Sequence, residues 1–264
     1  GFHQIKVHPE DTKYFAFATP DGQYEYNRLP FGFCKSPAEF QKRLVNILQA
    51  LIREEKVIVY IDDIMIASSS VDDNLETLRM TLAIIKQYGL ELNYGKCQFL
   101  HKEIQYLGYT VSEKGITLSS HHTEAVRNFP KPRNTTEVQR FLGLTSYFRR
   151  FIRNFADKAR PLYHLLKKDS AFNFDEQCIR AYETLKAELI TYPVLRIYNP
   201  KSETQLHTDA SAQGLAAILL QKQSSSCWAP IAYYSQSTNT TEAKYHSFEL
   251  EMLAIVRAIE RFHI

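Results

Sequence analysis

The sequence lacks any closely spaced pair of cysteines. Its four cysteines, at positions 34, 97, 178 and 227, are far apart, and none belongs to a C-x-x-C motif. Small secreted domains depend on dense disulfides, and structural zinc sites need thiolates or histidines at short spacing. The cysteine pattern therefore argues against both a disulfide framework and a zinc site.

Long apolar segments and repeats are also absent. No run reaches the roughly 18 apolar residues of a membrane span, and no signal peptide opens the chain. We therefore expect an intracellular protein with no membrane partner. The chain starts without an initiator Met and stops inside a helical pattern at residues 261–264, so we expect both ends to be truncated. Its 264 residues suffice for about two domains.

Neither sign of charge dominates the whole chain, but basic residues cluster in one block. The net charge is +3, whereas residues 127–168 hold eleven basic side chains against two acidic ones, which leaves −6 for the rest. Such a block favours a polyanionic partner through phosphate contacts and counterion release. A solvated helix face is the alternative explanation. The basic residues are Arg127, Lys131, Arg133, Arg140, Arg149, Arg150, Arg153, Lys158, Arg160, Lys167 and Lys168.

The first part of the chain predicts mixed strands and helices. Residues 14–26 read as a hairpin around Pro20-Asp21-Gly22. A helix is expected over 36–52 and another over 72–88, the second closed by Gly89. The expected strands are 57–61, 64–67, 97–100 and 104–109.

The second part predicts a helical region followed by a three-stranded segment. Asn134 to Glu137 offers a helix N-cap, and apolar residues then recur at helical spacing as far as Phe155, with Arg149 and Arg153 four apart on a neighbouring stripe. Another helix is expected over 171–191, ended by Tyr192-Pro193. The remaining elements are strands over 205–208, 216–220 and 231–235 and a helix over 241–262.

Two adjacent carboxylates, Asp62 and Asp63, carry the strongest local signal. They lie between two apolar strands, which we expect to be buried, and an unpaired buried carboxylate is costly. A divalent cation relieves that cost because hard cations prefer oxygen ligands. An ordinary hairpin turn, where Asp is common, is the alternative, and we favour the metal.

The surrounding motifs resemble the reverse transcriptase and ribonuclease H region of gypsy-class retrotransposon polyproteins. The blocks follow the order of that family over essentially the whole chain. They are Leu29-Pro30-Phe31-Gly32-Phe33, Ser36 to Gln41, Tyr60-Ile61-Asp62-Asp63, Leu92 to Cys97, Tyr106-Leu107-Gly108-Tyr109, Phe141 to Phe155 and His207-Thr208-Asp209-Ala210-Ser211.

This resemblance implies an α+β fold in three parts. Residues 1–113 would be the reverse transcriptase palm with part of the fingers, truncated at the N-terminal side. Residues 114–198 would be thumb and connection. Residues 199–264 would be a ribonuclease H-like α/β domain, truncated at the C-terminal side.

The resemblance also implies roles for individual residues of the polymerase site. Asp62 would be a metal ligand, with Asp63 as its less directly coordinating neighbour. Other positions would contact substrate or nucleic acid: Phe2 as the aromatic gate that selects deoxynucleotides, Phe31 at the incoming nucleotide, Tyr60 at the template–primer, Lys96 at the leaving pyrophosphate, Tyr106, Gly108 and Tyr109 as the primer grip, and Arg149, Arg150 and Arg153 at the phosphates. For Phe2 and Lys96, a core aromatic and a solvated lysine are the alternatives. Family members often have His where this chain has Tyr109.

The second implied site is a nuclease centre at Asp209, with a glutamate of the following helix as its partner. Glu249 and Glu251 both qualify. At about 100° per residue, Glu251 is turned further from Arg257, toward the apolar side near Phe248 and Ile255, and we choose it. Glu249 would then be a partly exposed structural residue.

The implied cofactor is Mg²⁺, with Mn²⁺ as the alternative, at two ions per active site held by Asp62 and Asp63 and by Asp209 and Glu251. Two ions about 3.5–4 Å apart clamp the attacking and leaving oxygens of such reactions. The first catalytic aspartate of the family would precede Gly1, and further nuclease aspartates would follow Ile264, so we expect each site to be incomplete within this chain.

The function implied is RNA-directed DNA polymerase with ribonuclease H activity. Its partners would be an RNA template, a DNA primer, an RNA–DNA hybrid, deoxynucleoside triphosphates, and the protease and integrase domains of the parent polyprotein, in a cytoplasmic virus-like particle with a nuclear phase. The alternative is a decayed or co-opted remnant that binds nucleic acid without catalysis. A plain cellular nucleic-acid-binding protein would leave the ordered motifs unexplained.

Overall fold

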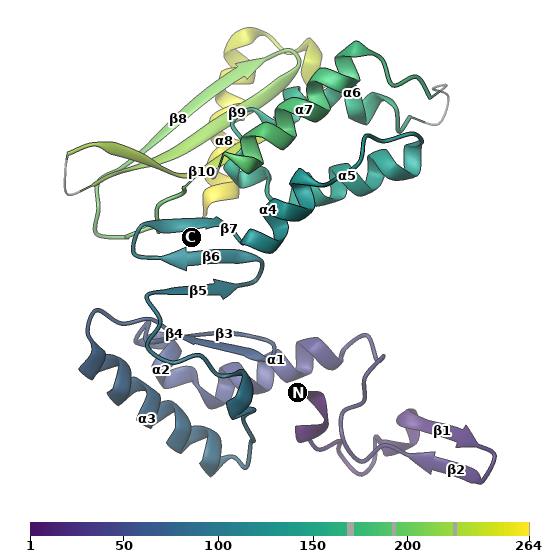
Figure 1. Cartoon of the computed structure of the whole chain (residues 1–264), viewed down its shortest axis with the longest axis vertical. Helices are drawn as coiled ribbons and strands as arrows, with labels where there is room; N and C mark the ends of the chain where they lie inside the picture. The colour runs from purple at the N-terminus through teal and green to yellow at the C-terminus, as the bar shows by residue number, and fades with distance from the viewer. Residues whose placement is uncertain (168–171, 192–193, 224–225, 264) are drawn as a thin grey trace. The chain divides into compact units, whose positions relative to one another are not determined.

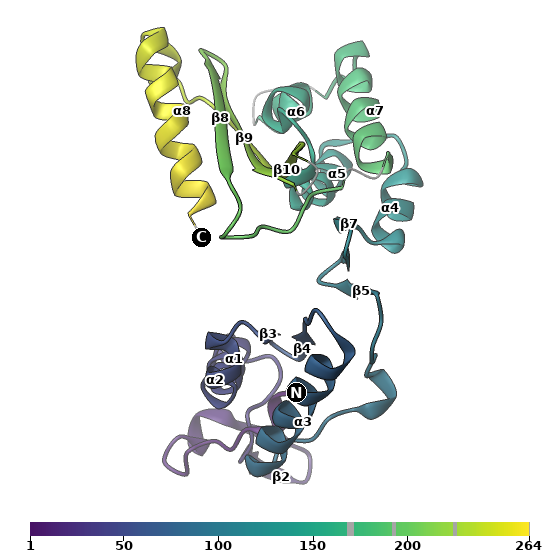
Figure 2. The same ribbon diagram turned by 90° about the vertical axis from the view of Figure 1, so that its left-hand side faces the viewer.

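The chain folds into two compact α+β units, residues 1–101 and 102–264 (Figure 1). The structure is a computed structural model that describes residues 1–167, 172–191, 194–223 and 226–263. Figure 2 shows the same elements from a second direction. Among these residues, no helix is long and apolar enough to cross a membrane. The three-part division at residues 113 and 198 stays a prediction.

The first unit combines two small hairpins with three helices. Strands β1 (Ala16–Thr19) and β2 (Gly22–Glu25) pair around Pro20-Asp21, as the sequence predicts. Strands β3 (Val57–Tyr60) and β4 (Asp63–Ile66) form the second antiparallel pair. The helices are α1 (Ser36–Ile47), α2 (Gln49–Arg53) and α3 (Val71–Gln87), and single turns of 3-10 helix occupy Phe2–Gln4, Thr12–Phe15 and Tyr94–Lys96.

Three expectations for this unit are wrong in detail, one of them the strand predicted over 97–100, which does not form. The helix expected over 36–52 breaks at Leu48, which is fully buried and lies between α1 and α2 in a non-helical conformation. Strand β3 is not buried on both faces, since Val57 is 2% exposed but its neighbour Ile58 is 47% exposed. Only one face of the β3–β4 hairpin therefore packs against a core, as period-2 alternation requires.

The second unit begins with a three-stranded antiparallel sheet of β5 (Glu103–Tyr106), β6 (Tyr109–Ser112) and β7 (Gly115–Leu118). The sequence predicts one strand over 104–109, but Leu107 (φ 50°) and Gly108 (φ 81°) both adopt left-handed conformations there. Two such residues turn the chain tightly back on itself and make a hairpin.

Four helices build the main core of the second unit: α4 (Ser120–Arg127), α5 (Thr135–Tyr147), α6 (Phe155–His164) and α7 (Glu176–Ile190). Asn134 caps α5, as expected, by accepting a hydrogen bond from the Glu137 amide. The helix does not run on to Phe155, because a 3-10 turn at Arg149–Phe151 and a left-handed Asn154 (φ 54°) interrupt it. The expected start of α7 at residue 171 and its stop at 192–193 lie outside the described residues.

The C-terminal part is a three-stranded antiparallel sheet with a helix on each side. Its strands are β8 (Thr204–Ser211), β9 (Gly214–Lys222) and β10 (Trp228–Ser237), in the order β10-β9-β8. Helix α8 (Ser247–Phe262) packs on β8 and β9, while α6 and the Arg149–Phe151 turn pack on β10 (Figure 1). The sheet thus joins the helical core to α8.

A short segment connects the two sheets of the second unit. Leu195 exchanges two backbone hydrogen bonds with Ile116 of β7, at 2.7 and 3.0 Å. The next residue, Arg196, donates its amide to the Pro230 carbonyl of β10 at 2.9 Å, and its guanidinium donates to the Lys114 carbonyl. Backbone hydrogen bonds therefore tie β7, this segment and β10 into one structure.

Candidate active sites

Asp62 and Asp63 lie at the tip of the β3–β4 hairpin. Tyr60 pairs with Asp63, so Ile61 and Asp62 form a two-residue turn. Ile61 has φ 50°, a conformation that is rare for a β-branched residue and costs about 1–3 kcal/mol. Backbone strain of this kind clusters at functional sites, so the local geometry supports a functional reading of the turn.

Both carboxylates are accessible. The Asp62 side chain is 60% exposed, and its Oδ1 lies 3.9 Å from the backbone nitrogen of Gly1. Asp63 opens β4 and is exposed as well. The expectation that apolar strands bury these carboxylates is wrong, because both lie exposed at the tip of the hairpin.

Aromatic rings lie beside the start of the chain. The Phe2 ring is 5.2 Å from the ring of Phe31 and 5.5 Å from that of Phe40, between centroids. Phe40 is buried in the core of α1, whereas Phe31 is 65% exposed. The Phe2 ring thus contacts a buried ring, Phe40, and an exposed ring, Phe31. Tyr60, at 49% exposed, and Lys96, in the 3-10 turn, face solvent.

The Asp62 and Asp63 carboxylates are suitable ligands for a hard cation, but two carboxylates are few for a metal site. Carboxylate oxygens are the ligands that Mg²⁺ and Mn²⁺ prefer. Within the described ranges, however, no three His, Cys, Asp or Glu side chains gather closely enough to form a metal site. The described residues therefore supply two carboxylates of a site, and the number of ions stays a prediction.

Side chains of α4 and α5 contact the tip of the Tyr106–Tyr109 hairpin. The Tyr147 hydroxyl donates to the Leu107 carbonyl at 2.9 Å, and the ring of Tyr109 stacks on that of Tyr147. Gly108 lies over His122, whose Cε1 would be 3.0 Å from a Cβ at that position. The pKa of His122 is lowered by burial and by His121. The hairpin tip is therefore held by side chains of α4 and α5.

Tyr109 keeps its proton over the whole physiological range. Burial, and then the neighbouring Tyr147, raise the pKa of its phenol to about 12. A phenol in that state can donate a hydrogen bond to an anionic oxygen at neutral pH.

The three arginines predicted to bind phosphates differ in their surroundings. The Arg149 guanidinium donates to the Ser235 carbonyl and lies 5.1 Å from the centroid of the Phe155 ring. Arg150 is partly buried, while Arg153 is exposed. They do not form a stripe on one helix, because α5 ends at Tyr147. Arg149 connects the 3-10 turn to β10, and Arg153 is the most accessible of the three.

We predict different results for Arg153→Ala and Arg149→Ala. Removal of one phosphate contact should lower the magnitude of the slope of log affinity against log salt by about 0.9 for B-form DNA. Arg153→Ala should lower the slope in this way without loss of stability. Arg149→Ala should cost about 1–2 kcal/mol of stability and change the slope less, because its hydrogen bond and ring contact lie within the fold. Fluorescence anisotropy on a labelled RNA–DNA hybrid at several salt concentrations, with thermal melting, measures both. An unchanged slope for Arg153→Ala would exclude it from the interface.

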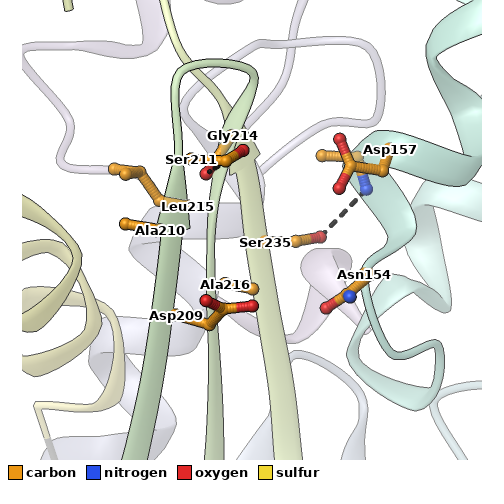
Figure 3. Close-up of a pocket in the computed structure, with 10 residues that line it drawn as sticks. Asn154, Asp157, Asp209, Ala210, Ser211, Gly214, Leu215, Ala216 and Ser235 are labelled. Carbon is orange, nitrogen blue, oxygen red and sulfur yellow. Dashed lines mark hydrogen bonds between the residues drawn. The ribbon is translucent and has the colours of Figure 1, made fainter. Parts of the chain in front are cut away.

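Asp209 lies in a small pocket of about 70 Å³ between β8 and the start of α6. Figure 3 shows its carboxylate near Ala216 and Asn154, with Asp157 and Ser235 further along the pocket. The Ser235 hydroxyl accepts a hydrogen bond from the Ala156 amide at 3.0 Å, which attaches α6 to β10.

Asp209 and Glu251 do not share a face of the sheet. Ala210 packs against Leu250 and Ala254 of α8, so its neighbour Asp209 points to the opposite face. Glu251 is exposed on α8, and Phe248 and Ile255, expected on the apolar side of the helix, are themselves exposed at 70% and 36%. Their pairing stays a prediction.

Glu249 has a structural contact instead. Its Oε2 accepts a hydrogen bond from the His246 amide at 2.9 Å, and the His246 side chain completes the reciprocal cap. The two glutamates therefore differ: Glu249 is used to start α8, and Glu251 remains available to solvent. The capping hydrogen bonds show this difference between the two glutamates, whereas the sequence analysis distinguished them by their angles around the helix.

Sequence reasoning missed two residues that hold the site motifs. Gln41 of α1 contacts the backbone of the Asp62–Asp63 hairpin through two hydrogen bonds. Tyr147 of α5 holds the tip of the Tyr106–Tyr109 hairpin. Gln41 ends the Ser36–Gln41 motif, so its residue type was visible. No local spacing rule connects it to position 61, which is 20 residues away.

Two protein families match separate parts of the chain. Residues 1–111 match the family described as "Reverse transcriptase (RNA-dependent DNA polymerase)". Residues 174–264 match the family described as "RNase H-like domain found in reverse transcriptase".

Curated relatives align over nearly the entire chain. It is 38% identical over 263 residues to the retrovirus-related Pol polyprotein from transposon 297 of Drosophila melanogaster, which covers 99% of the chain and 24% of that protein. It is 33% identical over 262 residues to the transposon Tf2-3 polyprotein of Schizosaccharomyces pombe, covering 99% of the chain and 20% of that protein. The chain thus spans about a quarter or less of the length of these relatives.

Solved structures show a similar fold. The chain matches a foamy viral protease-reverse transcriptase in complex with an RNA/DNA hybrid with a TM-score of 0.84 and 25% identity, over 97% of the chain and 34% of that protein. A second foamy viral structure, in complex with double-stranded DNA, gives a TM-score of 0.83 and 26% identity, over 97% of the chain and 53% of that protein.

Proposed function

Because this chain belongs to the reverse transcriptase and RNase H-like segment of retrotransposon Pol polyproteins, we propose that it takes part in copying RNA into DNA and in degrading the RNA strand of the resulting hybrid. The observation that carries the proposal is the pair of adjacent carboxylates at the strained turn, with Asp62 in the turn and Asp63 directly after it. Its substrates would be an RNA template, a DNA primer and deoxynucleoside triphosphates. The site of action would be a cytoplasmic particle with a nuclear phase.

Asp62 and Asp63 would hold divalent cations in the polymerase site. When bound, such cations neutralise charge on the transferred phosphate and on the leaving pyrophosphate. The chain's own contribution is to fix both carboxylates on a turn that has little freedom, with Asp63 anchored in the β3–β4 ladder. Phosphoryl transfer depends on positioning and charge neutralisation, so a fixed turn suits the reaction.

Phe2 would form the wall of the nucleotide sugar pocket. Its ring contacts both Phe31 and the buried Phe40, which restrict its movement. A rigid ring can exclude a 2′-hydroxyl by steric contact, whereas a mobile one cannot. Exposed Phe31, next to it, would contact the incoming nucleotide, and Tyr109 would donate to the primer from the second unit.

We predict that Phe2→Ala relaxes the choice of sugar. Removing the ring opens space for a 2′-hydroxyl, so the preference for deoxynucleotides over ribonucleotides should fall by at least about tenfold, a change of about 1.4 kcal/mol. The measurement is single-nucleotide incorporation with each nucleotide type, in a longer segment of the polyprotein. Phe33→Ala is the matched control, because Phe33 contacts Phe15 and lies outside the proposed pocket. An unchanged ratio in Phe2→Ala would make Phe2 a packing residue.

Asp209 and Glu251 would contribute to the nuclease site. Asp209 lines a pocket beside β8, and Glu251 is exposed on α8. The other Pol domains, protease and integrase, would be covalent neighbours in the parent polyprotein.

The proposed function is tested by primer extension on an RNA template with Mg²⁺ and by hydrolysis of a labelled RNA–DNA hybrid. Both are measured in a longer polyprotein segment, since the relatives are several times longer than this chain. Tight hybrid binding without extension or hydrolysis by that segment would favour the non-catalytic remnant.

A further inference from the structure

The Gln41 carboxamide makes two hydrogen bonds to the hairpin that carries Asp62 and Asp63. Its Nε2 donates to the Val59 carbonyl at 3.0 Å, and its Oε1 accepts from the Ile61 amide at 2.5 Å. Gln41 lies on α1, which packs against β3 (Figure 1). The partner groups belong to Val59 of β3 and to Ile61, the first residue of the turn, on either side of Tyr60.

These two backbone groups point away from β4. Tyr60 pairs with Asp63, so Tyr60 takes part in the ladder while Val59 O and Ile61 N face the free side of β3. Strand order shows no neighbour on that side among the described residues. A single carboxamide thus supplies the donor and the acceptor that one residue of an adjoining strand would supply.

The contact holds a residue in an unfavourable conformation. Ile61 has φ 50°, which a β-branched side chain rarely adopts. Its amide donates to Gln41 Oε1 in this conformation, and its side chain packs beside Leu29, Phe40 and Leu44. Without Gln41, the turn would be free to relax toward ordinary backbone angles, and Asp62, the next residue, would move with it.

We infer that Gln41 is a positioning residue that keeps the Ile61-Asp62 turn in its left-handed form, so that Asp62 and Asp63 present their carboxylates together to a divalent cation. The inference rests on the proposed metal role of these two aspartates. Gln41 itself does not touch the cation or the substrate.

Hydrogen exchange tests whether Gln41 holds the Ile61-Asp62 turn, and it needs no activity assay. In Gln41→Leu, which keeps the side-chain size and removes both bonds, exchange of the Ile61 amide should accelerate by about tenfold or more. The Tyr60 and Asp63 amides should remain protected, because their ladder does not involve Gln41. Gln49→Leu, on the exposed surface of α2, is the matched control and should leave all three unchanged. An Ile61 amide that exchanges equally slowly in Gln41→Leu would overturn the inference.

Manganese binding tests whether the held turn positions Asp62 and Asp63 for a divalent cation. The probe is Mn²⁺ alone, followed by paramagnetic broadening of the Asp62 and Asp63 signals in the full chain. Gln41→Leu should weaken Mn²⁺ binding there about tenfold, and Gln49→Leu should not. The loss should shrink in an Ile61→Asn background, because Asn tolerates the left-handed conformation without support. An equal loss in both backgrounds would indicate a packing role only and would overturn the inference.

The two measurements separate the possible failures. Absence of broadening at Asp62 and Asp63 in the unaltered chain would contradict the metal site of the proposed function and, with it, the cation half of this inference. Hydrogen exchange at Ile61 would then still decide whether Gln41 holds the turn.

Discussion

Asp62→Asn should abolish primer extension, with a loss of at least about 100-fold, or about 2.7 kcal/mol of transition-state stabilisation. Asparagine matches the shape of aspartate but lacks the charge that a divalent cation needs. Asp62 lies in the turn itself and is largely exposed, so the substitution removes no buried contact. The free energy of unfolding should therefore change little. Extension by a longer polyprotein segment in Mg²⁺, under single-turnover conditions, measures the effect.

Two controls isolate the role of that carboxylate. Asp72→Asn, in the exposed first turn of α3, removes the same charge away from the hairpin and should leave extension within about twofold. Hybrid affinity should survive in Asp62→Asn, because phosphate contacts come mainly from Lys and Arg. Extension at the unaltered rate by Asp62→Asn would exclude this turn as the polymerase site.

Gly115→Ala should destabilise the second unit by about 4 kcal/mol. A Cβ at this position would lie 2.3 Å from the Leu195 carbonyl oxygen, and the backbone has φ 128°. Backbone strain costs about 1–3 kcal/mol and a forced steric contact about as much again. The Leu195 carbonyl has little room to move, since it accepts the Ile116 amide at 2.7 Å. The substitution should therefore separate β7 from the segment that leads to β10.

The measurement is urea denaturation followed by tryptophan fluorescence. The only tryptophan, Trp228, lies in β10 and so reports on the second unit. Gly143→Ala is the matched control: Gly143 is in α5 with nothing within 4 Å of its added Cβ, and alanine there should stabilise the helix by up to about 1 kcal/mol. Equal urea midpoints for Gly115→Ala and the unaltered chain would contradict the prediction. They would show that the Leu195 carbonyl can move to make room for the added Cβ.

Most secondary structure could be predicted from local patterns. The β1–β2 turn, the cap at Asn134 and the three strands of the C-terminal sheet arise from neighbouring residues, and the structure places them where expected within a few positions. The errors occur where apolar residues keep helical spacing across a point at which the helix ends. Residues 36–52 and 134–155 keep helical spacing across Leu48 and across residues 148–154, because several of the interrupting residues are themselves apolar and buried.

The sequence by itself determined the family, the order of the motifs and the residue types of the candidate sites, because these motifs are contiguous and their chemistry is visible in single residues such as Asp62 and Asp209. Only the tertiary structure decided how those residues are used. It places Asp209 in a pocket beside the start of α6, attaches Arg149 to β10 and attaches Gln41 to the turn at Ile61. The last two contacts join residues 86 and 20 positions apart, and no local period encodes contacts over such distances.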